Sequence, residues 1–382
     1  MCFNSKNLYN AANYEIRQEF IKNGKYISYY DMNRNFKTHG EYKATMSQPA
    51  NCTLRSLDKA WKSYFNSIKD WKKNPHKYLG MPKLPKYLKR DGRYPWMIPN
   101  NTCYTEGNEL HFRIRKMKDT KWYCRNLGRL IQVRFIPRGT CYIMEIVYEV
   151  EIPDIQETKI DRVASIDLGV DNLVTMTNNI GKQPIIINGK IIKSINQYYN
   201  KRLAQEKHKL KIRHEIDWSQ KLDIITFKRY QRIKNYMHNT SAFIVKWCLE
   251  NNIQSLVIGK NKNWKQDSNM SNGSNQKFIM IPYEMLLTQL KYKCENVGIK
   301  FIETEERYTS GTSFLDGEEP IRQNYDKSRR IKRGLFKSNS GKLMNSDVNG
   351  SLQIMKKVFP NAFEKCYGIE AYLTPVVVNV VR

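Results

Sequence analysis

Two aspartates occupy positions where an acidic side chain destabilises the fold unless it is paired or binds a metal ion. Asp167 interrupts the apolar stretch 163–168, and Asp347 lies in the segment 345–350, directly before an apolar helical run. A buried carboxylate requires a partner or a metal ion. Cleavage of a phosphodiester by two divalent cations about 3.5–4 Å apart needs several converging carboxylates, and hard oxygen ligands favour Mg²⁺ or Mn²⁺. Both aspartates are therefore candidate metal ligands.

Each aspartate also has an ordinary structural interpretation. The stretch Ile166-Asp167-Leu168-Gly169 is typical of a strand that runs into a turn, where the glycine permits close approach of backbone or ligand. Asn, Ser and Asp, as found at 345–347, are common helix N-caps. The residues by themselves leave both interpretations open.

The elements that must position these aspartates alternate between strand and helix from residue 160 onward. Apolar runs and helical periodicity predict, in order, strands at 163–168, 172–176 and 184–192, helices at 195–215 and 225–251, a strand at 255–258, a helix at 283–297, a strand at 299–303 and a last helix starting near Asp347. This is the element order of the ribonuclease H-like fold, an α/β class.

The first part of the chain has different patterns. Residues 1 to about 90 are predicted to be helical, with one helix ending at Gly24 and a second, long helix running through 54–71. Alternation between 96 and 155 predicts β-structure, which fits a small barrel or sandwich.

Composition narrows the class of partner. The chain has 382 residues, and 65 Lys+Arg against 36 Asp+Glu give 65 − 36 = +29. Such an excess favours a polyanionic partner. No run of about 18 apolar residues exists, which argues against a spanning helix and a membrane role. The eight cysteines are widely spaced without a Cys-x-x-Cys pair, so we expect free thiols in a reducing cytoplasm.

Cations interleaved with aromatic rings indicate where nucleic acid would bind, because cations contact phosphates and flat rings stack on bases. In the first part the candidates are Lys62, Lys72, Lys83, Lys86, Tyr87, Arg90, Arg93 and Trp96. In the second part they are Arg229 and Arg232, on a helix with an apolar opposite face, and Arg329, Arg330 and Arg333. Each of them also fits a purely structural role.

The two aspartate motifs resemble the first and third motifs of the RuvC-type nuclease of TnpB proteins, the insertion-sequence-encoded, RNA-guided relatives of type V CRISPR effectors. The resemblance is collinear and runs over nearly the whole chain. It includes residues 5–10 (SKNLYN), 82–87 (PKLPKY), 258–261 (IGKN) with 264–266 (WKQ), and 308–310 (YTS).

This resemblance implies three domains: a helical recognition lobe at 1–95, a small β-barrel wedge domain at 96–158, and a RuvC-like nuclease domain at 159–382 with a basic insert at 311–344. It also implies an Asp-Glu-Asp catalytic site, of which Asp167 and Asp347 are the first and last members.

The middle glutamate departs from the commoner family pattern, in which it ends the fourth strand. Here that strand ends in Gly259, and the substitute is the pair Glu305-Glu306. Strands four and five are neighbours in this fold, so a carboxylate at the end of either reaches the same metals. We favour Glu305 as the ligand because it replaces the residue just before the Pro-x-Tyr-Thr-Ser-like stretch of relatives, which corresponds to 306–310 here. Glu306 stays open, and a surface acidic turn facing Arg307 is the alternative.

Two further departures concern the insert and the beginning of the chain. Most relatives carry a four-cysteine zinc ribbon before the final aspartate, but residues 311–346 contain no cysteine, so we expect no zinc. Relatives usually have a short strand ahead of the 5–10 motif, and we expect that wedge strand to be missing here.

The resemblance implies an RNA-guided DNA endonuclease that cuts next to a short adjacent motif with Mg²⁺ or Mn²⁺. The implied partners are a guide RNA from the end of the mobile element and target double-stranded DNA, with one protein copy per complex. Two alternatives stay open: a nuclease-inactive, RNA-guided DNA-binding repressor, and a guide-independent nuclease or transposase of the ribonuclease H fold.

Overall fold

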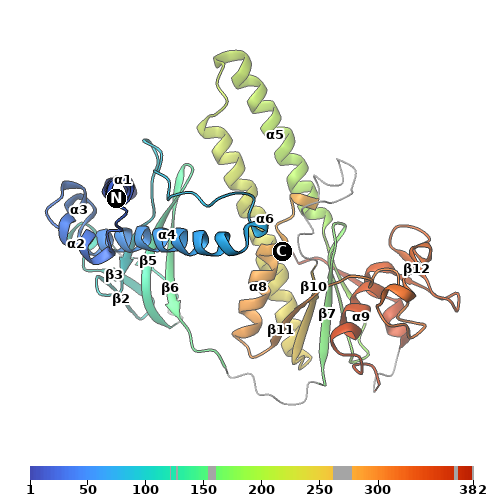
Figure 1. The fold of residues 1–382 in the computed structure, drawn as a ribbon. Helices are drawn as coiled ribbons and strands as arrows, with labels where there is room; N and C mark the ends of the chain where they lie inside the picture. The colour runs from blue at the N-terminus through green and yellow to red at the C-terminus, as the bar shows by residue number, and fades with distance from the viewer. Residues whose placement is uncertain (121, 126–127, 154–160, 261–277, 365–368, 381–382) are drawn as a thin grey trace. The chain divides into compact units, whose positions relative to one another are not determined.

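A computed structural model describes residues 1–382 except 121, 126–127, 154–160, 261–277, 365–368 and 381–382. The chain forms two compact units, Met1–Glu151 and Ile152–Arg382 (Figure 1). The predicted boundary at 158/159 and the 264–266 motif lie outside the described residues. Among those that are described, no helix is both long and apolar enough to cross a bilayer.

The first unit begins with four helices, α1 (Cys2–Asn23), α2 (Tyr29–Phe36), α3 (Gly40–Thr45) and α4 (Ser47–Lys73). As predicted, α1 ends before Gly24, whose φ of 65° only glycine adopts at little cost. The predicted long helix is α4, and Trp61 is its fully buried centre. Its indole nitrogen donates to Asn13 Oδ1 of α1 at 3.0 Å, which fixes the two helices side by side.

The segment that follows α4 returns along α1 instead of forming regular structure. Asn10 of α1 exchanges two hydrogen bonds with the backbone of Leu88, at 2.9 and 2.8 Å. Lys6 donates to the carbonyl of Arg90 at 2.7 Å, and Asn13 donates to that of Pro85 at 3.1 Å. Polar side chains of α1, two of them from the 5–10 motif, therefore satisfy the backbone of the segment 85–90.

The rest of the first unit is β-structure around one core. Strands β1 (Trp96–Pro99), β5 (Arg129–Arg138) and β6 (Cys141–Glu149) form one antiparallel sheet, and β2 (Cys103–Glu106), β3 (Glu109–Phe112) and β4 (Trp122–Tyr123) form another. Both contribute to a shared hydrophobic cluster. The sequence predicted a small barrel or a sandwich, and the described strands form two three-stranded sheets. The helices and sheets make one compact unit, and their division into two domains at 95/96 stays a prediction.

The second unit is built on a six-stranded sheet in the order β11-β10-β7-β8-β9-β14. Its strands are β7 (Val163–Leu168), β8 (Asn172–Asn178), β9 (Ile185–Asn188), β10 (Ser255–Gly259), β11 (Lys300–Thr304) and β14 (Val376–Val378). β7 pairs antiparallel with β8 and parallel with β10, and β10 pairs parallel with β11. The predicted α/β element order is confirmed, with β14 as an additional edge strand.

Helices cover both faces of this sheet. One face packs against α6 (Gln220–Glu250) and α8 (Tyr283–Glu295) through the largest hydrophobic cluster, and α5 (Lys190–His214) pairs with α6 to form a projecting hairpin (Figure 1). The other face packs against α9 (Ser346–Val358). Since side chains alternate along a strand, Ile166 and Leu168 of β7 face α6 and α8, and Asp167 faces α9.

The packing of α9 against the sheet depends on small polar residues. Ser165 donates to the carbonyl of Ser351 at 2.7 Å, and Ser351 donates back to the carbonyl of Ser165 at 3.0 Å. Thr177 of β8 completes this buried hydroxyl cluster. Satisfied hydroxyls at this depth bring α9 closer to β7 than larger side chains would allow.

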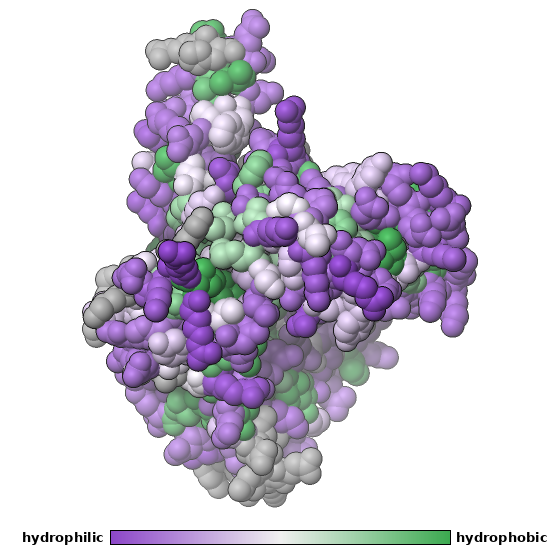
Figure 2. Space-filling view, turned by 90° about the vertical axis from the view of Figure 1, so that its left-hand side faces the viewer, coloured by the Kyte–Doolittle hydropathy of each residue, from purple (hydrophilic) through white to green (hydrophobic). Residues whose placement is uncertain are grey.

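The basic insert before α9 folds on a small core of its own. Its hairpin of β12 (Leu335–Lys337) and β13 (Leu343–Asn345) places Phe336 and Met344 against Val348, Leu352 and Tyr372. Asn349 of α9 binds the backbone of Thr312 and Phe314, which attaches the start of the insert to the helix. The insert thereby forms one wall beside Asp347. The surface drawn in Figure 2 is mostly hydrophilic, as the composition leads one to expect.

Candidate functional site

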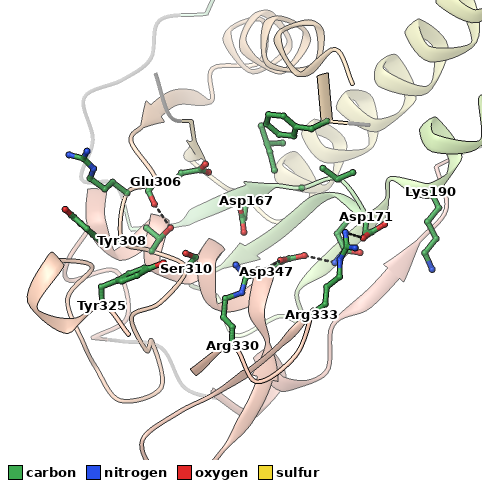
Figure 3. Close-up of a pocket in the computed structure, with 18 residues that line it drawn as sticks. Asp167, Asp171, Lys190, Glu306, Tyr308, Ser310, Tyr325, Arg330, Arg333 and Asp347 are labelled. Carbon is green, nitrogen blue, oxygen red and sulfur yellow. Dashed lines mark hydrogen bonds and ion pairs between the residues drawn. The ribbon is translucent and has the colours of Figure 1, made fainter. Parts of the chain in front are cut away.

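Three carboxylates from distant parts of the sequence line one cavity of about 990 Å³ in the second unit. Asp167 comes from β7, Glu306 from the turn after β11, and Asp347 from the first turn of α9. Figure 3 shows Asp167 between the other two. The parallel order of β7, β10 and β11 brings their carboxyl ends to the same sheet edge, and α9 begins there. The topology therefore gathers acids that are up to 180 residues apart (347 − 167).

Asp347 is not the N-cap of α9. Asn345 has that role, since its side-chain oxygen accepts from the backbone N–H groups of Asp347 and Val348. The Asp347 carboxylate instead faces the cavity and accepts a hydrogen bond from Asn172 Nδ2 at 2.7 Å. The N-cap interpretation of this aspartate is therefore wrong, because its neighbour performs the capping.

Glycine at 350 lets α9 approach the strand that carries Asp167. A Cβ atom built at Gly350 would lie 2.7 Å from Oδ2 of Asp167, closer than real Cβ contacts. The φ of this glycine is helical in sign, so the requirement is for space and not for an unusual backbone conformation. The Asn345–Gly350 motif thus provides the cap, the acid and the gap for its partner.

The side chain of Glu306 lies beside the end of β10. A Cβ atom built at Gly259 would lie 2.5 Å from Cδ1 of Ile354 and 3.1 Å from both the Cβ and the Oε2 atoms of Glu306. Gly259 pairs with Thr304 of β11, two residues before Glu306. The Glu306 side chain therefore occupies the space beside the end of β10 that a side chain at position 259 would enter.

Glu305 lies elsewhere. It is exposed and does not line the cavity, whereas Glu306 is half-buried and does. Lys357 of α9 donates to the backbone carbonyl of Glu305 at 2.8 Å, which orients the main chain of this turn. Our preference for Glu305 as the ligand is not supported by this placement, because consecutive residues in the turn point in different directions.

Burial, and secondarily repulsion between the carboxylates, disfavours the ionised form of the acids in this cavity. Burial raises the pKa of the Asp167 carboxyl well above its usual range, and the carboxylates of Glu306 and Asp347 raise it further. The Arg330 guanidinium acts in the opposite direction. Burial also raises the pKa of Glu306. A cation among the three carboxylates would relieve both the desolvation and the repulsion.

The donor set fits a hard divalent cation. All three acids offer oxygen ligands, which Mg²⁺ and Mn²⁺ prefer. Across the part of the chain that the structure describes, no three acidic, histidine or cysteine side chains lie close enough together to hold a metal ion as they stand. Mg²⁺ characteristically retains several waters and binds through few carboxylates, so an open arrangement suits it better than it would suit zinc.

Arginines of the insert form the opposite wall of the cavity. Arg330 lies 4.0 Å from the Asp347 carboxylate and donates to Ser346 Oγ at 3.4 Å, while Arg333 pairs with Asp171 (Figure 3). Asp171 also pairs with Lys193 of α5. We did not predict Asp171 and Asn172 from the sequence. The signal was a pair of polar residues one position beyond the Ile166–Gly169 motif, after Val170.

The predicted nucleic-acid contacts fall into two groups. Most are exposed and available: Lys62, Lys72, Lys83, Lys86, Tyr87, Arg90, Arg93, Arg232, Arg330 and Arg333. Lys62 pairs with Asp58 at 2.8 Å, and it lines a shallow hollow of about 490 Å³ on α4 with Lys59 and Tyr78. These exposed residues stay predictions.

Three of the predicted contacts have structural roles instead. Trp96 is only 3% exposed and donates to the carbonyl of Thr45 at 3.2 Å, so its ring cannot stack on a base. Arg329 is largely covered and pairs with Glu318 and Asp326 within the insert. Arg229 donates to Asn196 Oδ1 of α5 at 2.7 Å and to the carbonyl of Met280 at 3.2 Å. In sequence these residues look like the exposed ones, because burial depends on tertiary packing.

Arg229 should therefore matter for stability. We expect Arg229→Ala to lower the free energy of unfolding by about 1.5–3 kcal/mol, the range for hydrogen bonds to charged groups. The exposed neighbour Arg232 is the matched control, and Arg232→Ala should change it by less than about 0.5 kcal/mol. Urea titration followed by circular dichroism measures both. Equal effects of the two substitutions would contradict the structural role of Arg229.

Comparisons with known proteins give consistent matches. A family model described as "Probable transposase" (OrfB_IS605) matches residues 145–265, and a model for the TNB domain of Cas12f1-like proteins matches residues 283–354. A "TnpB-like protein ORF457" of Acidianus two-tailed virus is 25% identical over 390 residues, which cover 92% of this chain and 81% of that protein.

Two solved structures resemble the fold more distantly. One is a Cas12f1–sgRNA–target DNA complex, with a TM-score of 0.40, 14% identity, and coverage of 92% of this chain and 91% of that one. The other is a CRISPR-Cas12f ternary complex, with a TM-score of 0.42, 14% identity, and coverage of 92% and 79%. The two family models and the viral protein bear out the resemblance that the motifs predicted: the chain is similar to TnpB proteins.

Proposed function

We propose that this protein is an RNA-guided DNA endonuclease that cuts its target next to a short adjacent motif. One observation carries the proposal: Asp167, Glu306 and Asp347 line a single cavity whose opposite wall is built from arginines. Acids that bind cations beside arginines that bind phosphates are the arrangement that phosphodiester cleavage needs. Kinship with TnpB proteins supports the guide RNA, and the +29 charge supports a large polyanionic partner.

Each residue of the site would have a distinct task. Asp167, Glu306 and Asp347 would hold Mg²⁺, which when bound supplies an activated water and neutralises the leaving 3′ oxygen. Asn172 orients the Asp347 carboxylate through its hydrogen bond. Arg330, which is partly exposed beside Asp347, is positioned to contact a phosphate of the strand being cut. Arg333 and Lys190 line the same cavity and would hold flanking phosphates.

Exchange of the first aspartate tests this proposal. We expect the protein, with guide RNA and millimolar Mg²⁺, to linearise a supercoiled plasmid that carries a matched target, and EDTA to stop the reaction. Asp167→Ala should lower the rate by at least about 10³-fold, since it removes a ligand that acts in the transition state. Glu250→Gln, at an exposed carboxylate on the end of α6, is the control and should cut normally. Cleavage that survives Asp167→Ala would contradict the site.

The alternative function, a nuclease-inactive repressor, has less support once the position of Glu306 is considered. That alternative rested on the absent glutamate of the fourth strand, and Glu306 lies beside the strand's final residue, Gly259. Guided binding of target DNA without any cut, at millimolar Mg²⁺ and Mn²⁺, would restore it. A discrete RNA that co-purifies with the protein would in turn separate both guided functions from the guide-independent nuclease or transposase.

A further inference from the structure

Tyr308 has a backbone conformation that is costly for a tyrosine. Its φ is 70°, in the left-handed region, and it lies in the turn where Thr309 N–H donates to the carbonyl of Glu306 at 3.2 Å. The Thr309 hydroxyl donates to the same carbonyl at 2.7 Å. Glycine or asparagine ordinarily occupies such a position, and a tyrosine there is strained. A strained aromatic residue two positions after Glu306 requires an explanation.

Core packing does not provide one. Tyr308 is only half-buried, and it belongs to none of the five hydrophobic clusters formed by the described residues. Its recorded ring contacts are with Tyr325, edge-on at 5.9 Å, and with the Arg307 guanidinium at 5.7 Å. Arg307 is exposed, so this contact lies at the surface. Tyr308 nevertheless lines the cavity, so it lies at a surface that a bound strand would reach.

Tyr325, which contacts the Tyr308 ring, is held in place by close packing against the backbone. Tyr325 lies against the backbone of Gly311, where an added Cβ atom would approach its ring to 2.6 Å, so a side chain at 311 would displace it. Thr312 donates to the carbonyl of Tyr308 at 2.9 Å. Figure 3 shows Glu306 directed toward Asp167 and Tyr308 directed to the side. Within three residues, the turn offers a carboxylate, a cation and an aromatic ring.

This order matches the chemistry of a nucleotide strand, in which each base projects sideways from its phosphate. We propose that Tyr308 stacks on a nucleobase adjacent to the phosphodiester that is cut, with Arg307 as the contact for a flanking phosphate. The inference rests on the proposed function, because it assumes that a nucleic-acid strand binds at the three carboxylates. Stacking on an aromatic ring tolerates any base, since every base has a π-face. Tyr308 would thus select for the presence of a base and not for its identity.

Removal of the ring and of the base should have the same effect. The probe is a fluorescein-labelled single-stranded oligothymidine of about 12 nucleotides, compared with the same strand carrying central abasic sites, and binding is measured by anisotropy with Ca²⁺ in place of Mg²⁺. Tyr308→Asn tolerates the left-handed backbone and removes the ring, and Tyr308→Phe keeps the ring. We expect Tyr308→Asn to weaken binding of the intact strand by about 5- to 150-fold, the range for one stacked base.

The abasic strand provides the decisive comparison. Its binding to wild-type protein should be weakened to a similar degree, and Tyr308→Asn should then weaken it by less than about twofold further, because one interaction cannot be lost twice. Tyr308→Phe should bind like wild type. Equal losses on both strands, or no loss on either, would overturn the proposal. So would a fall in melting temperature of more than about 5 °C in Tyr308→Asn, which would assign the ring a structural role.

Plasmid cleavage distinguishes this inference from the proposed function. If wild-type protein cuts its guided target and the oligothymidine comparison shows no coupling, the stacking role fails and the nuclease stands. If the coupling is present and no guided target is cut, Tyr308 binds nucleic acid at a site that does not act as proposed.

Discussion

Glu306→Gln should reduce cleavage of a guided target by at least about 10³-fold, whereas Glu305→Gln should leave the rate within about twofold. Glutamine preserves the size of the side chain and removes its charge. Glu306 lines the cavity beside Gly259, while Glu305 is exposed and contributes its backbone carbonyl to Lys357, which the substitution retains. Single-turnover cleavage at saturating Mg²⁺ measures both rates.

The pair forms its own control, because the two substitutions are chemically identical and adjacent in sequence. Circular dichroism and melting curves of both variants check that the turn still folds. The assignment of Glu306 would be contradicted if Glu305→Gln caused the larger loss, and our original preference would then be restored. Equal and small losses would show that two aspartates suffice.

Asp167→Asn should stabilise the metal-free protein while it abolishes cleavage. The pKa of Asp167 is raised by burial and by the carboxylates of Glu306 and Asp347. For an acid with a raised folded-state pKa, the ionised form destabilises the fold, and this penalty grows as pH rises from the unfolded-state value toward the folded-state one. Asparagine carries no charge at any pH. The melting temperature in EDTA at pH 8 should therefore rise, by about 2–4 °C for each kcal/mol relieved.

Two further measurements check the cause of this effect. The gain should disappear near pH 4, where the Asp167 carboxyl of the wild type is protonated. Added Mg²⁺ should stabilise the wild type, because it binds only the folded state, and should stabilise Asp167→Asn less. Glu250→Gln, remote on α6, should match the wild type throughout. A lower melting temperature for Asp167→Asn in EDTA at pH 8 would show that the carboxylates do not repel one another.

The parts of the fold that depend on local pattern were accessible from the sequence. The apolar strand 163–168, the αL glycine after α1 and the start of α9 next to Asp347 all have short-range signals, and each occurs where it was expected. The strand predicted at 184–192 is shorter, because α5 already begins at Lys190. The facing of Asp167 toward α9 follows from alternation once the strand is known. Asp167 and Asp347 were accessible as site residues because an acid in an apolar run is locally anomalous.

What could not be read from the sequence depends on direction and burial. Glu305 and Glu306 are identical in type, and only the geometry of the turn directs one of them to Gly259. Arg229 and Arg232 lie on one helix, yet one binds Asn196 and the other is exposed. Trp96 follows a basic, aromatic segment and ends in a core. In each case contact with a residue from a distant part of the chain determines whether the side chain is buried or exposed.

The contact of α9 with β7 has a consequence for the protein during its own synthesis. Asp167 leaves the ribosome 180 residues before Asp347 (347 − 167), and the Ser165–Ser351 hydrogen bonds that seat α9 span 186 residues. At roughly 5–20 residues per second, about 9–36 s pass between the two aspartates. Throughout this interval the nascent chain has already exposed its basic helical segment but has no complete set of carboxylates. The order of translation therefore leaves the candidate site incomplete until α9 has been synthesised.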